Sequence, residues 1–359
     1  MYTINSKIFI SSFIDVLNSL KGHSVLILTS PSISRLNGIQ KVVEEIFVNS
    51  DCFLFIDDVI AENPFSYVST VYERMNFCPE YIIGIGGGSV IDLAKAISVS
   101  STIEELQEIF YHSKTLKKYS NVIAIPTTFG TGAETSYGAI LYDDEKKIKN
   151  GLRGVEVQPN LVYLDFDLYN SASKRIKALA GFDCMTHCVE TYVSLKSNDL
   201  IRYQAVKSLD TVFCNLEKAV EGDINAVKKM AIGSMMMGFN LAFSSTCMPH
   251  RLQYVIGPLT NTSHSEGLAA LYKGWIQFIS KNKTGPFSDL AKDLRMSTSE
   301  LKNKIERLKK NLGIDYSLTD FGLNTNDIEN ILQKVSGNLS ADPYYKDMDS
   351  VNEFIKLSL

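Results

Sequence analysis

Short apolar runs alternate with amphipathic stretches through the first half of the chain. The apolar runs occupy residues 25–28, 81–85, 122–125 and 161–165. An amphipathic stretch at residues 38–47 follows the first run, and another at residues 90–98 follows the second. Continuous apolar runs of this length are typical of buried strands, and amphipathic stretches between them are typical of helices. The pattern therefore predicts an α/β arrangement, a parallel sheet whose strands are connected by helices.

The hydrophobic period changes near residue 168. Beyond that point the apolar residues recur at helical spacing in long segments, which are 174–195, 199–217, 224–243, 265–279 and 299–312. We therefore expect an α/β domain over residues 1–168 and an all-helical domain over residues 169–359. A length of 359 residues agrees with two domains of ordinary size.

The number and distribution of charged residues argue against two classes of partner, nucleic acids and membranes. The chain carries 36 Lys and Arg against 40 Asp and Glu, for a net charge of −4, and contains no long run of like charge. A basic stripe for nucleic acid or anionic lipid is therefore not expected. No segment reaches the roughly 18 uncharged apolar residues that a membrane span requires, so we expect no membrane partner.

The cysteines bear on the cellular compartment. Six cysteines are present without the paired spacing of a disulfide framework, although Cys184 and Cys188 lie four residues apart. We interpret them as reduced thiols of a cytoplasmic protein. The expected partner is a small-molecule substrate, and the sequence leaves open a homodimer formed through an edge strand or a helix face.

A glycine-rich turn joins a predicted strand to a predicted helix. Gly86, Gly87, Gly88 and Ser89 stand between the run at residues 81–85 and the helix that follows. Glycines let the backbone approach a ligand without a Cβ clash, and a helix N-terminus offers unpaired N–H groups and a positive dipole end. The turn suits a pyrophosphate, although an ordinary tight strand-to-helix turn would contain the same glycines.

A second loop of the same kind follows the strand at residues 122–125. It carries three threonines and two glycines, which are Thr127, Thr128, Gly130, Thr131 and Gly132. Two such loops at the ends of parallel strands flank one crevice, where open α/β sheets bind nucleotides. Together they make a dinucleotide the favoured ligand.

The residues after the first strand bear on which dinucleotide binds. Many dinucleotide-binding folds place a carboxylate there to hold the ribose 2′-hydroxyl. Residues 29–35 instead contain Ser30, further hydroxyls and Arg35, with no acidic residue. A 2′-phosphate would meet hydroxyls and a cation, which favours NADP(H) over NAD(H). The alternative is a serine-rich loop that makes no selective contact.

Three of the five histidines are placed to bind a metal ion. His187 follows Asp183 by four residues in a predicted helix, so the two side chains project from one face. His250 and His264 flank the pair Gly257-Pro258, which we expect to break the helix and fold the histidines towards each other. Three imidazoles and one carboxylate suit Fe²⁺ or Zn²⁺. Taken singly, such residues are more often surface pairs or packed core histidines.

Over essentially its whole length the chain resembles the iron-containing (group III) alcohol dehydrogenases. The matching positions are Asn63-Pro64, Gly86 to Ser89 with Asp92 and Lys95, Pro126-Thr127-Thr128, Gly130-Thr131-Gly132 with Glu134, Asp183 with His187, and His250 with His264. The resemblance implies an α/β N-terminal dinucleotide-binding domain and an all-α C-terminal domain, an architecture shared with dehydroquinate synthase. It also implies a divalent metal in the cleft, bound by Asp183, His187, His250 and His264.

The resemblance implies contacts to NAD(P) as well. The expected cofactor residues are Gly86, Gly87, Gly88, Ser89, Asp92, Thr127, Thr128, Thr131 and Lys149, to which the argument above adds Ser30. Gly87, Gly88 and Ser89 are implied to contact the pyrophosphate. The threonines are implied to line the stretch from adenosine to nicotinamide, and Lys149 to lie on the ribose side.

Three positions depart from the family pattern. Tyr254 stands where many members have a proton-relaying histidine, and Ser265 replaces the usual glycine after the last ligand. Because a tyrosine hydroxyl can pass a proton, we assign Tyr254 to catalysis together with Asp183 and His250. The third departure, Arg251, follows a ligand where small residues are common.

Arg251 bears on the substrate. Its guanidinium could hold a carboxylate, phosphate or phosphonate, and some family members with this tyrosine reduce phosphonoacetaldehyde. Alternatively, Arg251 points to solvent or pairs with an acidic residue.

The expected function is therefore that of a metal-dependent, NAD(P)H-linked alcohol dehydrogenase or aldehyde reductase. A small aldehyde or primary alcohol is the expected substrate, with anionic-tailed aldehydes such as phosphonoacetaldehyde included. One alternative is a lyase or cyclase of the dehydroquinate-synthase kind, which also uses NAD and a metal. A second alternative is a non-catalytic nucleotide-binding protein that retains the fold.

Overall fold

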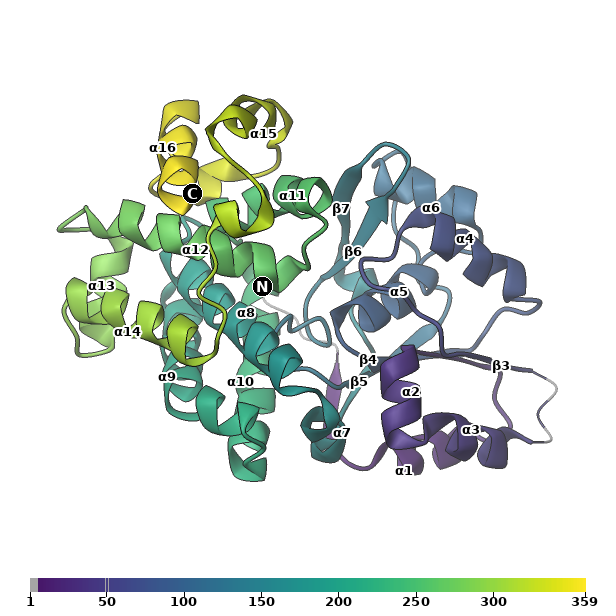
Figure 1. The fold of residues 1–359 in the computed structure, drawn as a ribbon. Helices are drawn as coiled ribbons and strands as arrows, with labels where there is room; N and C mark the ends of the chain where they lie inside the picture. The colour runs from purple at the N-terminus through teal and green to yellow at the C-terminus, as the bar shows by residue number, and fades with distance from the viewer. Residues whose placement is uncertain (1–5, 49, 51) are drawn as a thin grey trace. The chain divides into compact units, whose positions relative to one another are not determined.

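The computed structural model describes residues 6–48, 50 and 52–359. The chain divides into two units, Met1–Ser173 and Lys174–Leu359 (Figure 1). The boundary expected at residue 168 falls inside helix α7 (Phe166–Ser171), which belongs to the first unit.

Six parallel strands form the sheet of the first unit, in the order β1-β8-β5-β4-β2-β3. They are β1 Lys7–Ile10, β2 Val25–Thr29, β3 Phe53–Ile56, β4 Tyr81–Gly86, β5 Asn121–Pro126 and β8 Leu161–Leu164. The connecting helices are α1 Phe13–Ser19, α2 Pro31–Asn37, α3 Ile39–Phe47, α4 Phe65–Arg74, α5 Gly88–Ile97 and α6 Ile103–Phe110. The four predicted apolar runs form β2, β4, β5 and β8, which confirms the α/β prediction.

Successive residues of the central strands enter cores on opposite faces of the sheet. Ile82 of β4 packs with Val122 of β5 in the core that α4, α5 and α6 complete. Ile83 packs with Ile123 in the other core, with side chains of α1 and α3. Because both faces are covered, these strands are apolar at nearly every position, which explains their continuous apolar runs.

Four of the observed strands, β1, β3, β6 and β7, are not predicted by the sequence pattern. The strands β6 Gly138–Asp143 and β7 Ile148–Arg153 form an antiparallel hairpin, followed by the short 3₁₀ turn Val155–Val157. Alternate residues of β6 are buried, so the hairpin has no continuous apolar run. The edge strand β1 is exposed at all four residues, and only one residue of β3 is fully buried. Strands with partial burial lack the signal that identified the central strands.

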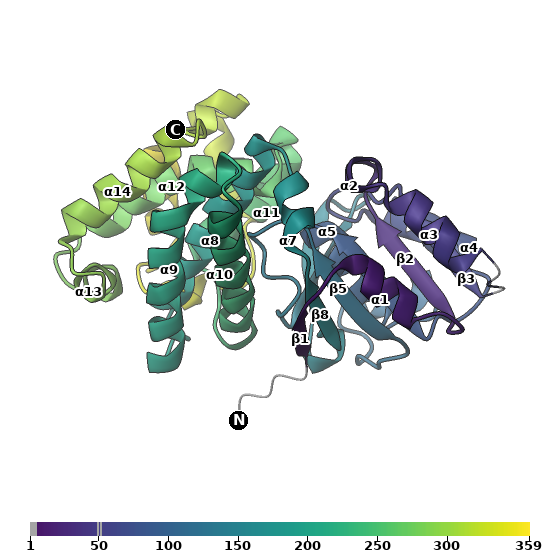
Figure 2. The ribbon, with the colours of Figure 1, turned by 90° about the horizontal axis from the view of Figure 1, so that it is seen from below.

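The second unit, all of whose residues are described, contains helices and no strand. Its helices are α8 Lys174–Val193, α9 Asp199–Val220, α10 Ile224–Phe243, α11 Met248–Thr260, α12 His264–Ser280, α13 Pro286–Asp293, α14 Thr298–Asn311, α15 Ile328–Lys334 and α16 Met348–Ser358. Short 3₁₀ turns occupy Leu318–Phe321, Thr325–Asp327 and Leu339–Ala341. Helices α8, α9 and α10 lie side by side (Figure 2). The prediction of an all-helical second part is confirmed.

Helix α8 is surrounded by other helices. Every residue of the segment 181–193 is buried, and α8 packs against α9, α10, α12 and α13. A helix buried on all sides has no polar face to turn towards water. Its polar side chains must therefore find partners within the protein.

The expected helix break at Gly257-Pro258 is wrong. Helix α11 continues through Pro258 to Thr260 and ends where Asn261 adopts the left-handed conformation, with φ of 54°. Proline normally disfavours a helical residue before it because its ring clashes with that residue's Cβ, and Gly257 has none. Since Pro258 lies in the last turn, it removes one backbone hydrogen bond without ending the helix.

The serine-rich segment after β2 is not a loop throughout. Ser30 occupies the N-cap position of α2 with an extended backbone but makes no side-chain capping hydrogen bond, and Pro31 takes the first helical position, where its fixed φ is suited to a helix. Gly38, with φ of 60°, then separates α2 from α3. The helix expected at residues 38–47 therefore begins at Ile39.

No helix in the described part of the chain is long and apolar enough to cross a membrane. All six cysteines are free thiols. Cys184, Cys188 and Cys247 are buried, whereas the other three are exposed.

Candidate metal centre and nucleotide-binding loops

Asp183, His187 and Glu190 lie along one side of the buried helix α8. Their spacing of four and then three residues places the side chains one above another. The side chains of Asp183 and Glu190 are 1% and 0% exposed. Two carboxylates in such surroundings require cations or hydrogen-bond donors, because an uncompensated buried charge is strongly unfavourable. Those partners come from α11 and α12.

The three imidazoles converge on Asp183. Its Oδ1 atom lies 3.8 Å from His187 Nε2, 3.7 Å from His250 Nε2 and 4.0 Å from His264 Nε2. The Nε2 atoms of His187 and His250 are 2.9 Å apart. His250 lies in the first turn of α11, and His264 is the first residue of α12. The packing of three helices thus brings together the four residues that the sequence analysis placed in one metal site.

The charges and the donor atoms of this cluster suit a cation. Burial alone would raise the pKa of Asp183, but the neighbouring histidines hold it well below its ordinary value. Burial lowers the pKa of His250, yet the carboxylates of Glu190 and Asp183 outweigh burial and raise it to about 9. Asp183 Oδ2 is buried and has no hydrogen-bond partner within the described residues. A buried carboxylate oxygen beside three imidazole nitrogens fits a divalent first-row metal ion.

Two of the histidines have an acceptor on the far side of the ring. His250 Nδ1 lies 2.8 Å from Glu190 Oε1, and His264 Nδ1 lies 2.9 Å from Gln253 Oε1. Each contact directs the Nε2 atom towards Asp183. The sequence analysis missed both acceptors. Glu190 carried a usable signal, because it stands seven residues after Asp183 in an otherwise largely apolar helix, whereas Gln253 carried none.

Tyr254 and Arg251 lie beside each other on α11, close to the cluster. The Tyr254 ring centroid is 6.4 Å from that of His264 and 5.6 Å from Arg251 Cζ. Arg251 is buried and donates from Nη2 to Thr246 Oγ1 at 2.6 Å. Its Nε atom has no hydrogen-bond partner in the part of the chain that the structure describes. The alternative in which Arg251 points to solvent is therefore wrong.

The two predicted nucleotide loops face each other at the carboxyl ends of β4 and β5, where Gly86 pairs with Pro126. A Cβ on Gly88 would lie 2.8 Å from Thr131 Cγ2, and a Cβ on Gly87 would lie 3.2 Å from Thr128 Oγ1. Two loops can come this close only where one of them has no side chain. The glycines therefore serve the approach of the loops to each other.

The expected cofactor residues differ in their accessibility. Gly87, Gly88, Ser89, Thr128 and Thr131 are half-buried. Gly86, Thr127 and Asp92 are buried. The Ser89 hydroxyl accepts a hydrogen bond from the N–H of Glu62 at 3.1 Å, and the Ser89 carbonyl accepts one from Asn63 Nδ2 at 2.8 Å. The turn after β3 is thereby fixed against the first turn of α5.

Asp92 makes its polar contacts within the protein. Its Oδ2 atom accepts a hydrogen bond from the N–H of Ile140 at 3.0 Å, and Oδ1 lies 3.7 Å from Lys95 Nζ. Lys95 is buried and donates to the carbonyls of Ala133 and Ser136, at 2.8 and 3.1 Å. Burial lowers the pKa of Lys95 to about 8. The pair joins α5 to the second loop and to β6.

Of the two remaining expected cofactor residues, Lys149 is linked through Glu62 to Ser89 of the first loop, whereas Ser30 lies at the start of α2. Lys149 of β7 forms an ion pair with Glu62, with 2.9 Å between Nζ and Oε1. Ser30 Oγ lies 3.3 Å from Ser32 Oγ at the start of α2. Ser34 donates from Oγ to Asp57 Oδ2 at 3.3 Å, so the end of β3 brings a carboxylate to the segment that follows β2.

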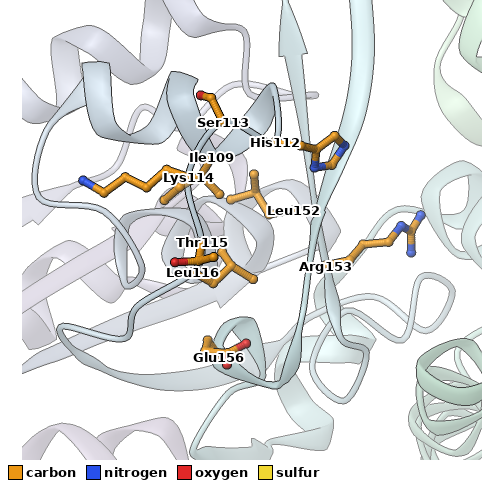
Figure 3. Close-up of a pocket in the computed structure, with 9 residues that line it drawn as sticks. All are labelled: Ile109, His112, Ser113, Lys114, Thr115, Leu116, Leu152, Arg153 and Glu156. Atoms are coloured by element: carbon orange, nitrogen blue, oxygen red, sulfur yellow. The ribbon is translucent and has the colours of Figure 1, made fainter.

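A cavity of about 400 Å³ lies elsewhere in the first unit, beside α6 and β7. Its lining residues are Ile109, His112, Ser113, Lys114, Thr115, Leu116, Leu152, Arg153 and Glu156 (Figure 3). Lys114 and Arg153 point in opposite directions in that view, and Lys114 Nζ lies 2.8 Å from Glu105 Oε1. The polar groups of this cavity do not converge on a common point, which a ligand site requires.

Two profiles of known families match the chain. The profile described as iron-containing alcohol dehydrogenase matches residues 7–166. A second, described as the C-terminal part of the Fe-containing alcohol dehydrogenase family, matches residues 177–358.

Curated relatives align over most of their own length. Lactaldehyde reductase of Escherichia coli K12 is 26% identical over 324 residues, which cover 86% of this chain and 84% of the relative. NADPH-dependent butanol dehydrogenase of Clostridium saccharobutylicum is 25% identical over 342 residues, which cover 90% of this chain and 87% of the relative.

Solved structures share the fold. An archaeal alcohol dehydrogenase from a Red Sea brine pool superposes with a TM-score of 0.89 at 20% identity, over 100% of this chain and 98% of that chain. An iron-containing alcohol dehydrogenase of Thermotoga maritima gives a TM-score of 0.85 at 23% identity, over 100% of this chain and 99% of that chain. Because the two profiles together match nearly the whole chain, the protein belongs to the iron-containing alcohol dehydrogenase family and is an oxidoreductase.

Proposed function

We propose that the protein is an NAD(P)H-linked enzyme that interconverts a small aldehyde and its primary alcohol at a divalent metal centre. The observation that carries this proposal is the convergence of Asp183 with His187, His250 and His264. The lactaldehyde reductase and butanol dehydrogenase relatives are both named for small substrates. In this proposal the first unit is the NAD(P)-binding domain, and the second unit is the metal-binding domain.

Asp183, His187, His250 and His264 would hold Fe²⁺ or Zn²⁺. An ion held there supplies a Lewis acid for a carbonyl oxygen, and a bound nicotinamide supplies the hydride. The protein's own part is to orient the imidazoles, to exclude water from a buried carboxylate and to move a proton. Tyr254 is the proposed proton donor, because its ring lies beside His264 and its hydroxyl can pass a proton.

The facing loops of the first unit would bind the dinucleotide. Gly87, Gly88 and Ser89 begin α5, and the first N–H groups of a helix have no acceptor within the helix. These groups and the positive end of the helix dipole suit a pyrophosphate. Thr128 and Thr131 present half-buried side chains opposite them. Asp92 and Thr127 would act beneath this surface rather than on it.

Within this proposal we favour NADP(H) over NAD(H). The start of α2 offers the hydroxyls of Ser30 and Ser32 and the side chain of Arg35 to a 2′-phosphate. The carboxylate of Asp57, which accepts a hydrogen bond from Ser34, would repel a 2′-phosphate and counts against this preference. The Clostridium relative is named as NADPH-dependent. A tighter apparent affinity for NADH than for NADPH would contradict this preference.

The first prediction concerns the metal. Protein loaded with Fe²⁺ or Zn²⁺ should oxidise NADPH when short aldehydes are supplied, and chelation should abolish turnover until the ion is restored. His250→Ala should lose bound metal and turnover, because a ligand nitrogen is removed, while it retains NADPH binding. Metal content by mass spectrometry, NADPH fluorescence and absorbance at 340 nm measure these outcomes, with His23→Ala as the control because His23 lies on the surface of the other unit.

The same assay separates the alternatives. A lyase or cyclase of the dehydroquinate-synthase kind consumes no net NAD(P)H, so product formation without net oxidation would favour that reaction. A non-catalytic nucleotide-binding protein would bind NADPH yet contain almost no metal after careful purification. Full activity of His250→Ala would remove the metal assignment.

The second prediction concerns the proton. Tyr254→Phe removes the hydroxyl and leaves the ring, so kcat for aldehyde reduction should fall by about 10²-fold or more. Metal content and NADPH affinity should be unchanged. Tyr203→Phe, at a tyrosine that is 65% exposed on α9, is the matched control. A near-normal pH–rate profile for Tyr254→Phe would show that another group supplies the proton.

Arg251 supports a substrate with an anionic tail, as in phosphonoacetaldehyde. Arg251 directly follows His250 in the sequence, and its side chain is buried. Its guanidinium Nε atom lacks a protein partner among the described residues. A buried guanidinium favours a carboxylate, sulfonate, phosphate or phosphonate as the missing acceptor. We therefore include aldehydes with a short anionic tail in the proposed substrate class.

The third prediction tests this tail contact. A hydrogen bond to a charged group contributes about 1.5–3 kcal/mol, which corresponds to about 10- to 150-fold in affinity. Arg251→Met should therefore raise KM for phosphonoacetaldehyde by about that factor and leave KM for propionaldehyde nearly unchanged. An equal loss on both aldehydes in steady-state assays would mean that Arg251 only supports the structure.

We also propose that the protein forms a homodimer through the free edge of β1. Ile8, Phe9 and Ile10 are 37%, 41% and 69% exposed on a strand that pairs with β8 alone among the described strands. An apolar edge strand with unpaired backbone groups readily pairs with another strand. As a fourth prediction, sedimentation should show a dimer that the double substitution Ile8→Lys and Ile10→Lys converts to a monomer. A wild-type monomer at micromolar concentration would contradict this proposal.

A further inference from the structure

Three hydrogen-bond donors surround the carboxylate of Glu190 in the interior of the second unit. His250 Nδ1 lies 2.8 Å from its Oε1 atom. The Tyr272 hydroxyl lies 3.1 Å from the same oxygen and 3.0 Å from the Thr186 carbonyl, so its one hydrogen is shared between these two acceptors. The N–H of Cys247 donates to Oε2 at 2.6 Å. The side chain of Glu190 is 0% exposed and that of His250 is 3% exposed. Water therefore does not compete for these contacts.

We propose that Glu190 is a positioning residue for the metal centre, a role that rests on the metal site proposed above. Its Oε1 atom accepts the Nδ1–H of His250, which fixes the tautomer whose Nε2 atom carries the lone pair. That Nε2 atom faces Asp183 Oδ1 at 3.7 Å and His187 Nε2 at 2.9 Å. A carboxylate behind a ligand histidine also increases the basicity of its imidazole.

The hydrogen-bond pattern requires a carboxylate at this position. Each oxygen of Glu190 faces a donor of its own, His250 Nδ1 at Oε1 and the N–H of Cys247 at Oε2, and an ionised carboxylate has only acceptors to offer. A glutamine would bring one oxygen and one NH₂ group. If its oxygen faced His250, its NH₂ group would oppose the N–H of Cys247. Glu190→Gln therefore loses at least one contact whichever way the amide is turned.

Anchoring the start of α11 is not by itself a sufficient reason for a buried carboxylate at position 190. Asp342 Oδ2 accepts the N–H of Met248 at 3.1 Å and Trp275 Nε1 at 3.0 Å, so the start of α11 is already held by a second buried carboxylate. No hydrogen bond of Asp342 with an imidazole is found among the described residues. What Glu190 adds is the contact to the ring of His250.

The charges of the site give an independent reason to assign Glu190 to the metal centre. Asp183 and Glu190 are two buried carboxylates on one helix, and together they match the charge of one divalent ion. His264, whose side chain is 26% exposed, has the neutral amide of Gln253 in the corresponding place. The charged acceptor thus stands behind the buried ligand, where an ion would be most in need of compensation.

The fifth prediction is tested by metal binding without turnover. Wild type, Glu190→Gln and the matched control Asp342→Asn are titrated with Zn²⁺ against a chromophoric chelator, and their Co²⁺-loaded forms are compared by visible absorption. Loss of an outer acceptor typically costs about 10- to 100-fold in metal affinity. We expect Glu190→Gln to weaken Zn²⁺ binding by that factor and to shift the Co²⁺ bands. Asp342→Asn should lower the melting temperature and leave affinity and bands unchanged.

Each outcome decides the proposal. Affinity of Glu190→Gln within about twofold of wild type, with an unchanged spectrum, overturns it, and so does an equal loss of affinity in Asp342→Asn. If Glu190→Gln does not fold, Glu190→Asp takes its place, because it keeps the charge and draws the oxygens back from the ring. Absence of Zn²⁺ binding in the wild type would instead refute the metal site on which the proposal rests.

Discussion

The burial of Asp183 among three imidazoles is the constraint on which the second unit depends. Helix α8 is enclosed by other helices, so neither Asp183 nor Glu190 can reach water. Their charges are tolerable only if donors or cations arrive from elsewhere, and the first turns of α11 and α12 bring them. The N-terminus of α11 is accordingly fixed by two buried carboxylates, Glu190 and Asp342.

The first unit meets a geometric constraint rather than an electrostatic one. Parallel pairing of β4 with β5 brings the turns after both strands to the same edge of the sheet. The turns then approach so closely that a Cβ on Gly88 would clash with Thr131, and a Cβ on Gly87 would make a tight contact with Thr128. Lys95 of α5 also holds the second loop in place, because its buried ammonium group donates hydrogen bonds to two carbonyls of that loop. The two loops are thereby held against each other at the N-terminus of α5, whose first N–H groups have no acceptor within the helix.

Two of the three positions that depart from the family pattern, Arg251 and Tyr254, lie on α11, whereas the third, Ser265, lies on α12. His250, Arg251 and Tyr254 share the first two turns of α11, so the helix that provides a ligand also carries the residues expected to set substrate and proton transfer. The acceptors behind the ligands lie on α8 and α11, deeper in the unit. Variation in substrate can therefore arise on α11 without disturbing the support of His250.

The sequence alone determined the α/β-then-helical order, the four central strands and the pairing of Asp183 with His187, because burial on both faces and helical spacing are local properties. It added His250 and His264 to them by the resemblance to the family and by a helix break that does not occur. It did not determine the edge strands or the β6–β7 hairpin, whose half-exposed residues carry no continuous pattern. It also gave the wrong course for α11, because whether Pro258 ends a helix depends on its place in the last turn and on the missing Cβ of Gly257. The roles of Glu190 and Gln253, the burial of Arg251 and the inward position of Asp92 were decided by tertiary packing alone. Hydrogen bonds between side chains 11 to 60 residues apart follow from helix packing, which no local spacing encodes.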